Sequence, residues 1–254
     1  MKRLHGLLHC RMRMPAATVG AMGIYGYSVW ADWRHLTSPE ELAAEAGLLS
    51  PMEASLLRPV RLPCFLSADE IQAICTLAQE AGDVPYATVE RAGPGALDAV
   101  HGKLAAGCAS WSTTYLHVDG MFSNRLPNLR DKLVGAALEV DKNHWGLCAK
   151  CRCVAAERLG VSPNIQVRTA ELHRVTAGGS LPQPNHCDYG SCVTLDIMLS
   201  RPDIDFGGGQ LQFPGAAAGM ETEQPAFEQG DAVVFPSHKF HCVHPVHWGL
   251  RQVC

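Results

Sequence analysis

The chain has 254 residues, of which 47% are hydrophobic and 18% charged, and its net charge is −4. This length and hydrophobic content suffice for one sizeable core, and the balance argues against a nucleic-acid-binding protein, which carries a basic excess on one face. The eleven cysteines are odd in number and irregularly spaced, which favours reduced thiols in the cytoplasm over a disulfide framework. No apolar run reaches the roughly 18 residues of a membrane-spanning helix.

Residues 1–60 are expected to form an extension of the domain that follows. Basic residues precede the first acidic residue, Asp32, and the mildly apolar stretch 16–30 follows them. This start is either a poorly ordered terminus, which we favour, or a targeting segment for the secretory pathway or an organelle. Ser38-Pro39-Glu40-Glu41 and Ser50-Pro51-Met52-Glu53 each combine an N-cap serine, a proline and a glutamate, which predicts two short helices.

Two longer helices are predicted next, with a strand between them. Ser67 and Glu70 form a capping box for the first helix, and Gly82 ends it. Its apolar residues recur at 3.6-residue spacing at Ile71, Ile74, Cys75 and Ala78. The second helix is predicted from Asn128 to about Asn143, and residues 111–118 are predicted to form the strand.

After residue 163 the pattern changes to short segments in which apolar and polar residues alternate. The predicted strands are 165–169, 193–199, 210–213, 232–235 and 240–246. Glycine, proline and aspartate separate them, as in antiparallel sandwiches and barrels. Because helices precede the strands instead of alternating with them, we expect an α+β, mainly β fold whose helices pack on one face of the β core.

The residues that point to chemistry lie in this β part. His186-Cys187-Asp188 stands beside a predicted strand, where alternate side chains point to the same side, so the imidazole and the carboxylate converge. A second imidazole from another strand would complete a facial triad. That arrangement is typical of non-haem Fe(II) oxygenases, because it leaves positions open for a co-substrate and O2.

The candidates for the third ligand are His238, His241, His244 and His247. On a strand over 240–246, His241 and His244 would face opposite sides. Arg251 follows after a turn predicted at Trp248-Gly249, and an antiparallel return would place its guanidinium beside His241, where it could bind a carboxylate bidentately. His241 is therefore favoured, with His244 or His247 as alternatives.

Six motifs follow one another over residues 186–254. They are His186-Cys-Asp188, Ser191-Cys-Val-Thr-Leu195, Gly207-Gly-Gly-Gln-Leu211, Gly230-Asp-Ala-Val-Val-Phe235, His241-Cys-Val-His-Pro-Val246 and Gly249-Leu-Arg251. In this order they resemble the prolyl 4-hydroxylase-type Fe(II)/2-oxoglutarate-dependent dioxygenases, and the resemblance extends over about residues 63–254. It implies a double-stranded β-helix (jelly roll, cupin-like) domain over 61–254, with the catalytic part at about 163–254.

The resemblance also implies the roles of individual residues. His186, Asp188 and His241 would be the iron ligands, Arg251 would bind the distal carboxylate of 2-oxoglutarate, and Thr194 would line the same pocket. O2 would be the second co-substrate, and ascorbate is a further cofactor compatible with the resemblance. The expected reaction is hydroxylation of a peptidyl, proline-like substrate or a small molecule, with release of succinate and CO2.

Three features depart from the family pattern. Leu172 or Val175, and also Met198, stand where tyrosines are expected, and the printed sequence ends three residues after Arg251. Losing a hydrogen bond to a charged group costs about 1.5–3 kcal/mol, so weak binding of 2-oxoglutarate is expected. Two alternatives follow: a catalytically inactive β-helix binding module, and a cupin-like metal enzyme that does not use 2-oxoglutarate, which Arg251 argues against.

Some further residues leave alternatives open. One group of soft metal ligands comprises His144, Cys148, Cys151 and Cys153. It is either a structural zinc site or, as we favour, a cysteine-rich linker. Asp196 is either a site residue or part of a solvated strand face, and Pro182 and Pro184 predict an extended loop.

Overall fold

The computed structural model describes residues 49–82, 88–91, 110–150, 167–188, 190–215 and 221–254. All of them belong to the second of two compact units, Asp32–Cys254. The helix predicted at Ser38 and the apolar stretch 16–30 lie outside the described residues. Within them, no helix has both the length and the apolar character needed to cross a membrane.

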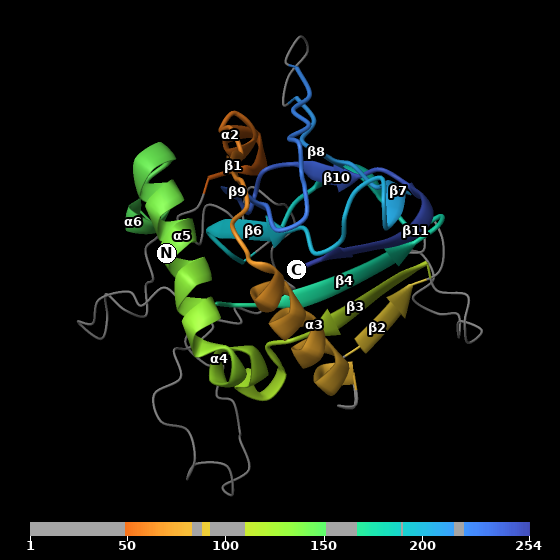
Figure 1. Ribbon diagram of the computed structural model, residues 1–254. Helices are drawn as coiled ribbons and strands as arrows, with labels where there is room; N and C mark the ends of the chain where they lie inside the picture. Colours follow the sequence, from red (N-terminus) through yellow and green to blue (C-terminus); the bar gives the residue numbers. More distant parts are fainter. Residues whose placement is uncertain (1–48, 83–87, 92–109, 151–166, 189, 216–220) are drawn as a thin grey trace, which may run out of the picture. The chain divides into compact units, whose positions relative to one another are not determined.

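The strands of the described residues form three antiparallel sheets (Figure 1). The largest has the order β2 (Thr88–Arg91), β3 (Trp111–Tyr115), β4 (Glu171–Thr176), β11 (Val246–Val253) and β7 (Phe206–Gly208). The second has the order β1 (Val60–Leu62), β9 (Ala232–Pro236) and β6 (Val193–Ile197). The third has the order β5 (Leu181–His186), β10 (His241–Val243) and β8 (Leu211–Gln212).

Two of the helices begin where the capping boxes predict, after Ser50 and after Ser67. The described α-helices are α2 (Pro51–Ser55), α3 (Ala68–Gly82), α4 (Met121–Arg125), α5 (Pro127–His144) and α6 (Leu147–Lys150), and a 3-10 turn covers Val118–Gly120. The backbone N–H of Ser67 donates to Glu70 Oε2 (2.8 Å), and the N–H of Glu70 donates to Ser67 Oγ (3.2 Å). Ser50 and Glu53 form the same box at α2, so both predicted caps are confirmed.

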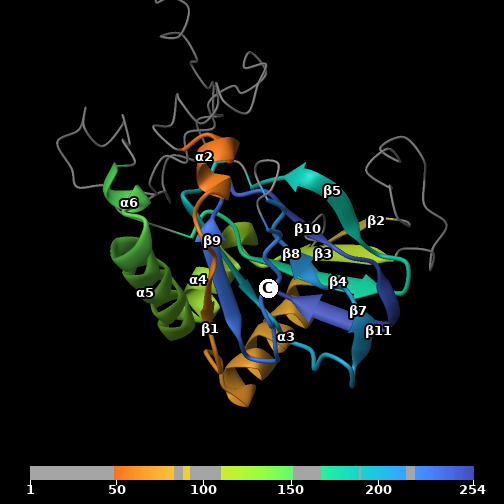
Figure 2. The same ribbon diagram turned by 90° about the horizontal axis from the view of Figure 1, so that it is seen from above.

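Two hydrophobic cores lie on either side of β4. Leu172 belongs to the core that α3, α4 and α5 share with the sheets, and Val175 belongs to the core between the sheets. Opposite faces of one strand thus serve both cores, as the pleat requires. Figure 2 shows the three helices together on one side of the strands. The other side of β4 is therefore left to face the interior between the sheets.

The prediction of a strand at 165–169 is wrong for its described residues. Residues 167–170 are not part of a strand, and β4 begins at Glu171. β4 pairs with β3 on one side and with β11 on the other, with Leu172 opposite Thr114 and Val175 opposite Arg251. These partner strands determine where β4 begins. The alternation of apolar and polar residues within one segment does not show which strands it pairs with.

The predictions of one strand over 240–246 and of a turn at Trp248-Gly249 are also wrong. β10 ends at Val243, and β11 begins after Pro245, whose missing N–H cannot continue a ladder. β11 then continues through Gly249 (φ 78°) with a register irregularity between Val246 and Trp248. His241 and Arg251 therefore lie in different sheets and are not partners in a hairpin.

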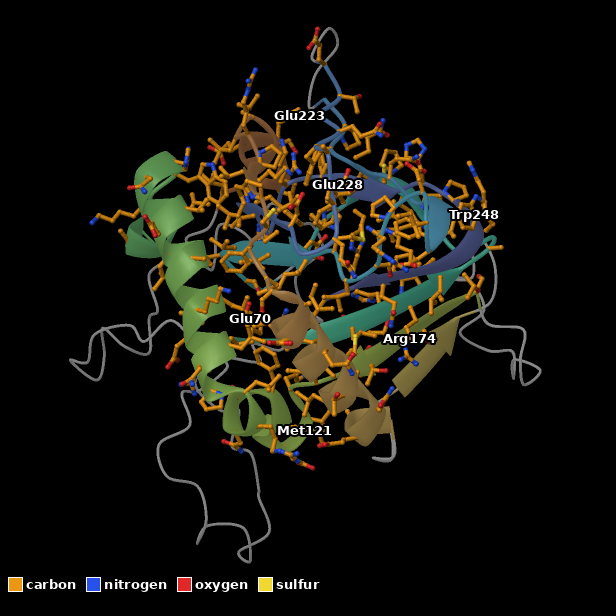
Figure 3. The ribbon with its side chains drawn as sticks, in the orientation of Figure 1. Glu70, Met121, Arg174, Glu223, Glu228 and Trp248 are labelled. Atoms are coloured by element: carbon orange, nitrogen blue, oxygen red, sulfur yellow. The ribbon has the colours of Figure 1, made fainter. Side chains whose placement is uncertain are left out.

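A smaller expectation also changes. Pro182 and Pro184 lie in β5, not in a loop, and β5 is an edge strand of its sheet, where a missing N–H is tolerated. Trp248 is half exposed on β11 (Figure 3), and its indole covers Gly207 so closely that a Cβ there would collide with the ring.

The Gly230-Asp231 motif connects the N-terminal strand to the core. The carboxylate of buried Asp231 accepts hydrogen bonds from Arg61 Nε (2.7 Å) and from the backbone N–H groups of Cys64 (2.8 Å) and Glu228 (2.9 Å). Gly230 has φ 82°, and a Cβ there would lie 2.7 Å from the Leu66 carbonyl oxygen. This motif thus has a structural role beside β1 and β9.

Candidate metal centre

The pairing of β5 with β10 brings two histidines together. His186 ends β5, His241 begins β10, and the two are direct partners in the ladder. Asp188 follows two residues after β5, and its backbone N–H donates to the Ser237 carbonyl (2.8 Å). The H-x-D element and a histidine far along the chain therefore meet at one point of the sheet.

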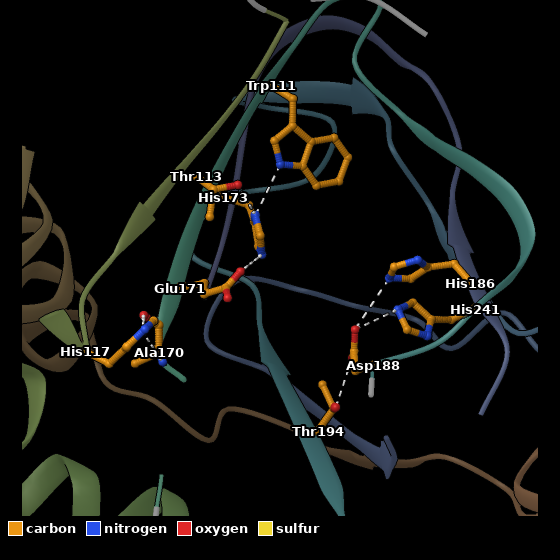
Figure 4. Close-up of polar contacts among 10 residues, drawn as sticks. All are labelled: Trp111, Thr113, His117, Ala170, Glu171, His173, His186, Asp188, Thr194 and His241. Carbon is orange, nitrogen blue, oxygen red and sulfur yellow. Dashed lines mark hydrogen bonds and ion pairs between the residues drawn. The ribbon is translucent and has the colours of Figure 1, made fainter. Parts of the chain in front are cut away.

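The three side chains point toward one another (Figure 4). His186 Nε2 lies 3.5 Å and His241 Nε2 lies 3.8 Å from Asp188 Oδ1, and the ligand atoms of all three lie within 4.8 Å of one another. Neighbouring ligands about 2.1 Å from a metal lie about 3 Å apart, so small movements would let all three bind one ion. In the part of the chain that the structure describes, no other such group of His, Cys, Asp and Glu is found.

Neighbouring groups orient two of these side chains. His241 Nδ1 lies 3.0 Å from the Lys239 carbonyl oxygen, so the neutral ring carries its proton on Nδ1 and keeps the Nε2 lone pair for a metal. Thr194 Oγ1 donates to Asp188 Oδ2 (2.9 Å), which leaves Oδ1 toward the imidazoles. The Phe235 ring, 5.1 Å from His241, packs against the imidazole.

The protonation states suit a metal. Burial pushes the pKa of Asp188 upward, but hydrogen bonding to His186 and the charges of His241 and His186 outweigh it, so this pKa lies below its usual value. Burial lowers the pKa of His241 despite the nearby Asp188 carboxylate. An ionised carboxylate and a neutral imidazole are the forms that bind a divalent cation.

Arg251 is a buried cation with unused donors. It is 2% exposed, and its Nε and Nη2 have no hydrogen-bond partner among the described residues. Burial lowers its pKa to about 10, against the opposing effect of the Asp196 charge, so the guanidinium remains protonated at neutral pH. A Cβ at Gly209 would lie 2.7 Å from Arg251 Cδ, so this glycine leaves room for the side chain. Such a group fits an anionic ligand.

Asp196 belongs to the interior of the site. Alternate residues of β6 share a face, so Asp196 lies on the same side as Thr194, which contacts Asp188. Burial, followed by the charge of Asp188, raises the pKa of Asp196 to about 7, while Arg251 opposes the rise. The structure thus favours a site residue over a solvated strand face.

A further polar group was not predicted. Trp111 Nε1 donates to His173 Nδ1 (3.1 Å), and His173 Nε2 lies 3.6 Å from Glu171 Oε2. Figure 4 shows these side chains, on β3 and β4, facing the same interior as the metal ligands. The alternation of Glu171, His173 and Val175 along β4 is the sequence signal for this face.

The other candidate histidines do not join the triad. His238 Nδ1 lies 3.0 Å from the Leu49 carbonyl oxygen, and His244 Nε2 lies 3.0 Å from Gln212 Oε1. His247 is exposed on β11. Among the described residues, His241 is therefore the histidine that joins His186 and Asp188.

The group of His144, Cys148, Cys151 and Cys153, either a zinc site or a cysteine-rich linker, is only partly described. His144 is the exposed last residue of α5, and Cys148 lies in α6, where its N–H donates to Asp141 Oδ2 (2.9 Å). Cys151 and Cys153 lie outside the described residues. No disulfide joins the cysteines that are described.

No known family model and no curated protein sequence matches the chain. Several solved structures are similar to it at low identity. An oxidoreductase of the 2OG-Fe(II) oxygenase family from Burkholderia pseudomallei is 16% identical, with a TM-score of 0.41 over 86% of this chain and 88% of that one. A viral collagen prolyl hydroxylase from Paramecium Bursaria Chlorella virus-1 is 14% identical (TM-score 0.45; 77% and 92% covered), and a Pseudomonas putida prolyl-4-hydroxylase is 15% identical (TM-score 0.42; 84% and 95% covered). Similarity of this degree establishes no family, so the function proposed below depends on the chain's own residues.

The raised pKa of Asp196 predicts a pH-dependent stability. A carboxyl whose pKa is raised on folding stabilises the protein below its ordinary pKa of 3.8, and this contribution is lost as the pH rises through about 7. Asp196→Asn should therefore raise the melting temperature of the metal-free protein at pH 8, and the gain should shrink as the pH falls from 7 to 4. Thermal unfolding over this range measures it, with Asp131→Asn on the exposed face of α5 as a control. A gain independent of pH would contradict the prediction.

Proposed function

We propose that residues 61–254 form a double-stranded β-helix that works as an Fe(II)- and 2-oxoglutarate-dependent dioxygenase, with residues 1–60 as an extension. The observation that carries this proposal is the convergence of His186, Asp188 and His241 on paired strands, in protonation states suited to a metal. The three antiparallel sheets and the ordered motifs support it.

The donor set fits ferrous iron. Two imidazoles and one carboxylate leave coordination positions open, which a structural zinc site does not. Bound iron would supply the oxidation of a C–H bond by O2, coupled to conversion of 2-oxoglutarate to succinate and CO2. The chain's part is to keep His241 in the Nδ1-protonated form through the Lys239 carbonyl and to direct Asp188 through Thr194.

Arg251 is proposed to hold the distal carboxylate of 2-oxoglutarate. Its two buried nitrogens without partners would gain charge-assisted hydrogen bonds. The anion would compensate the positive charge of a guanidinium that is buried away from water. Thr194 Oγ1 also lies 2.9 Å from Ser237 Oγ, and with its proton directed to Asp188 it accepts from that hydroxyl, so any contact with the co-substrate would use its remaining lone pair. Thr194 therefore cannot donate to the 2-oxoglutarate carboxylate while it donates to Asp188.

The finer assignment follows the motif resemblance to the prolyl 4-hydroxylase type. A peptidyl, proline-like side chain is therefore the first substrate class to test, with ascorbate as an added reductant. The inactive binding module and the cupin-like enzyme remain the competing functions. The burial of Arg251 with unused donors argues against the second, because a site without an anionic ligand would leave this charge uncompensated.

Anaerobic titration tests the proposal. The wild-type protein with Fe(II) and 2-oxoglutarate should develop the weak visible charge-transfer absorption of an Fe(II)–2-oxo acid chelate, and Asp188→Ala and His241→Ala should abolish it. His244→Ala is the matched control, because this histidine is exposed and lies outside the triad. Folded wild-type protein that binds iron without the absorption would favour the cupin-like enzyme. Folded protein that binds neither ligand would favour the inactive module.

Removing the guanidinium should affect the co-substrate alone. Arg251→Met loses hydrogen bonds to a charged group worth about 1.5–3 kcal/mol, which corresponds to a roughly 10- to 150-fold weaker affinity for 2-oxoglutarate, while metal affinity stays unchanged. Calorimetric titration of the Mn(II)-loaded protein measures both. Arg174→Met is the control, because Arg174 shares β4 with Val175 but lies on the opposite face. Unchanged 2-oxoglutarate affinity in Arg251→Met would remove Arg251 from the co-substrate site.

A further inference from the structure

The residues directly before the ligand His241 are attached to the N-terminal segment. We call residues 238–240 the ligand loop and residues 49–55 the strap. Three hydrogen bonds join them: Leu49 O with His238 Nδ1 (3.0 Å), Lys239 Nζ with Ser55 O (2.9 Å) and Phe240 N with Ser55 Oγ (3.1 Å). Every residue of the ligand loop therefore has a contact with the strap.

The strap is locally rigid. Its short helix α2 starts with the Ser50–Glu53 capping box, and Pro51 restricts the backbone at the first turn. Pro51, Ala54 and Ser55 are all buried. The Ser55 carbonyl and hydroxyl are thus presented to the ligand loop from a fixed position.

Lys239 links the strap to the metal ligand itself. Its side chain is 1% exposed, with Nζ bonded to Ser55 O and 3.4 Å from Glu223 Oε1, while its own carbonyl faces His241 Nδ1 at 3.0 Å. The ammonium also lies 5.5 Å from the Phe213 ring centroid, and that ring packs against His241. Lys239 thus connects α2 with the Nδ1 atom of the ligand imidazole and with a ring that lies beside it.

A buried lysine at position 239 carries a free-energy cost. Burying an ammonium costs free energy unless partners compensate it, and an apolar side chain of similar length would fill the same volume without that cost. What the lysine adds is a directional contact that prevents the ligand loop from rotating relative to the strap. Rotation of the loop would turn the Lys239 carbonyl away from His241 Nδ1, and the imidazole would no longer be held in its orientation.

We propose that the strap is a positioning element of the metal centre, which aligns His241 for metal binding through Lys239 and Phe240. This inference rests on the function proposed above. Ser55 and Lys239 touch neither metal nor substrate, so they are positioning residues. Their effect is to hold the carbonyl that orients the ligand, and groups in such positions typically change metal affinity by 10- to 100-fold.

Co(II) titration of the full-length protein under anaerobic conditions tests the proposal, because its visible d–d absorption reports both affinity and ligand geometry. Ser55→Ala removes the hydroxyl that accepts from Phe240, and Lys239→Met removes the ammonium while keeping the apolar stem. Each should weaken Co(II) binding by about 10-fold or more and change the absorption spectrum. Ser55→Ala is the milder change and keeps the test open if Lys239→Met does not fold.

Two variants control for general loss of stability. Ser67→Ala removes the N-cap of α3, and Lys132→Met on α5 removes an ion pair with Glu70 of α3. Neither residue is hydrogen-bonded to the ligand loop. They should bind Co(II) with wild-type affinity and spectrum. Folded Ser55→Ala and Lys239→Met with wild-type affinity and spectrum would overturn the role of the strap and leave the proposed function intact. If His241→Ala binds Co(II) as the wild-type protein does, the proposed function is overturned and, with it, this inference.

Discussion

The register between β5 and β10 is the constraint on which the site depends. It places His186 directly opposite His241 and leaves Asp188 just beyond the end of the strand. Because strand side chains alternate, a slip of one residue would turn His241 to the other face and bring Cys242 into its place. The pairing of β10 with β8 on its other side, and the contacts of the strap with the ligand loop, oppose such a slip. Residues far from the chemistry thus determine whether the ligands meet.

The interior between the sheets carries a concentration of charge that a metal would relieve. Burial and then the charge of Asp188 disfavour ionisation of Asp196, which is why the pKa of Asp196 reaches about 7. Arg251 is the buried cation that opposes this effect, and its donors are still unused. A divalent cation at the triad would offset the charge of Asp188 that acts on Asp196, and an anion at Arg251 would compensate a guanidinium whose charge burial disfavours. The electrostatics therefore agree with the proposed pair of ligands.

Local signals could be predicted from the sequence because their causes are local. The capping boxes at Ser50 and Ser67 begin helices, and the H-x-D spacing directs His186 and Asp188 to one place. Long-range pairing was not accessible in this way. The start of β4 at Glu171 and the passage of β11 through Gly249 both depend on partner strands, so the alternation of single segments misplaced them. Asp196 stayed ambiguous for the same reason, since its environment is made by residues on other elements. The helix of the strap was predicted from its capping box, but its contacts with the ligand loop left no signal, because they run through backbone groups, the Ser55 hydroxyl and a lysine with no motif around it.

Diffraction from crystals loaded anaerobically with Fe(II), recorded at the iron absorption edge, would show whether the triad binds iron. We expect one strong anomalous peak bonded to His186 Nε2, an oxygen of Asp188 and His241 Nε2, with open positions facing the interior between the sheets. A peak held by other residues, or none in crystals whose triad is ordered, would contradict this expectation.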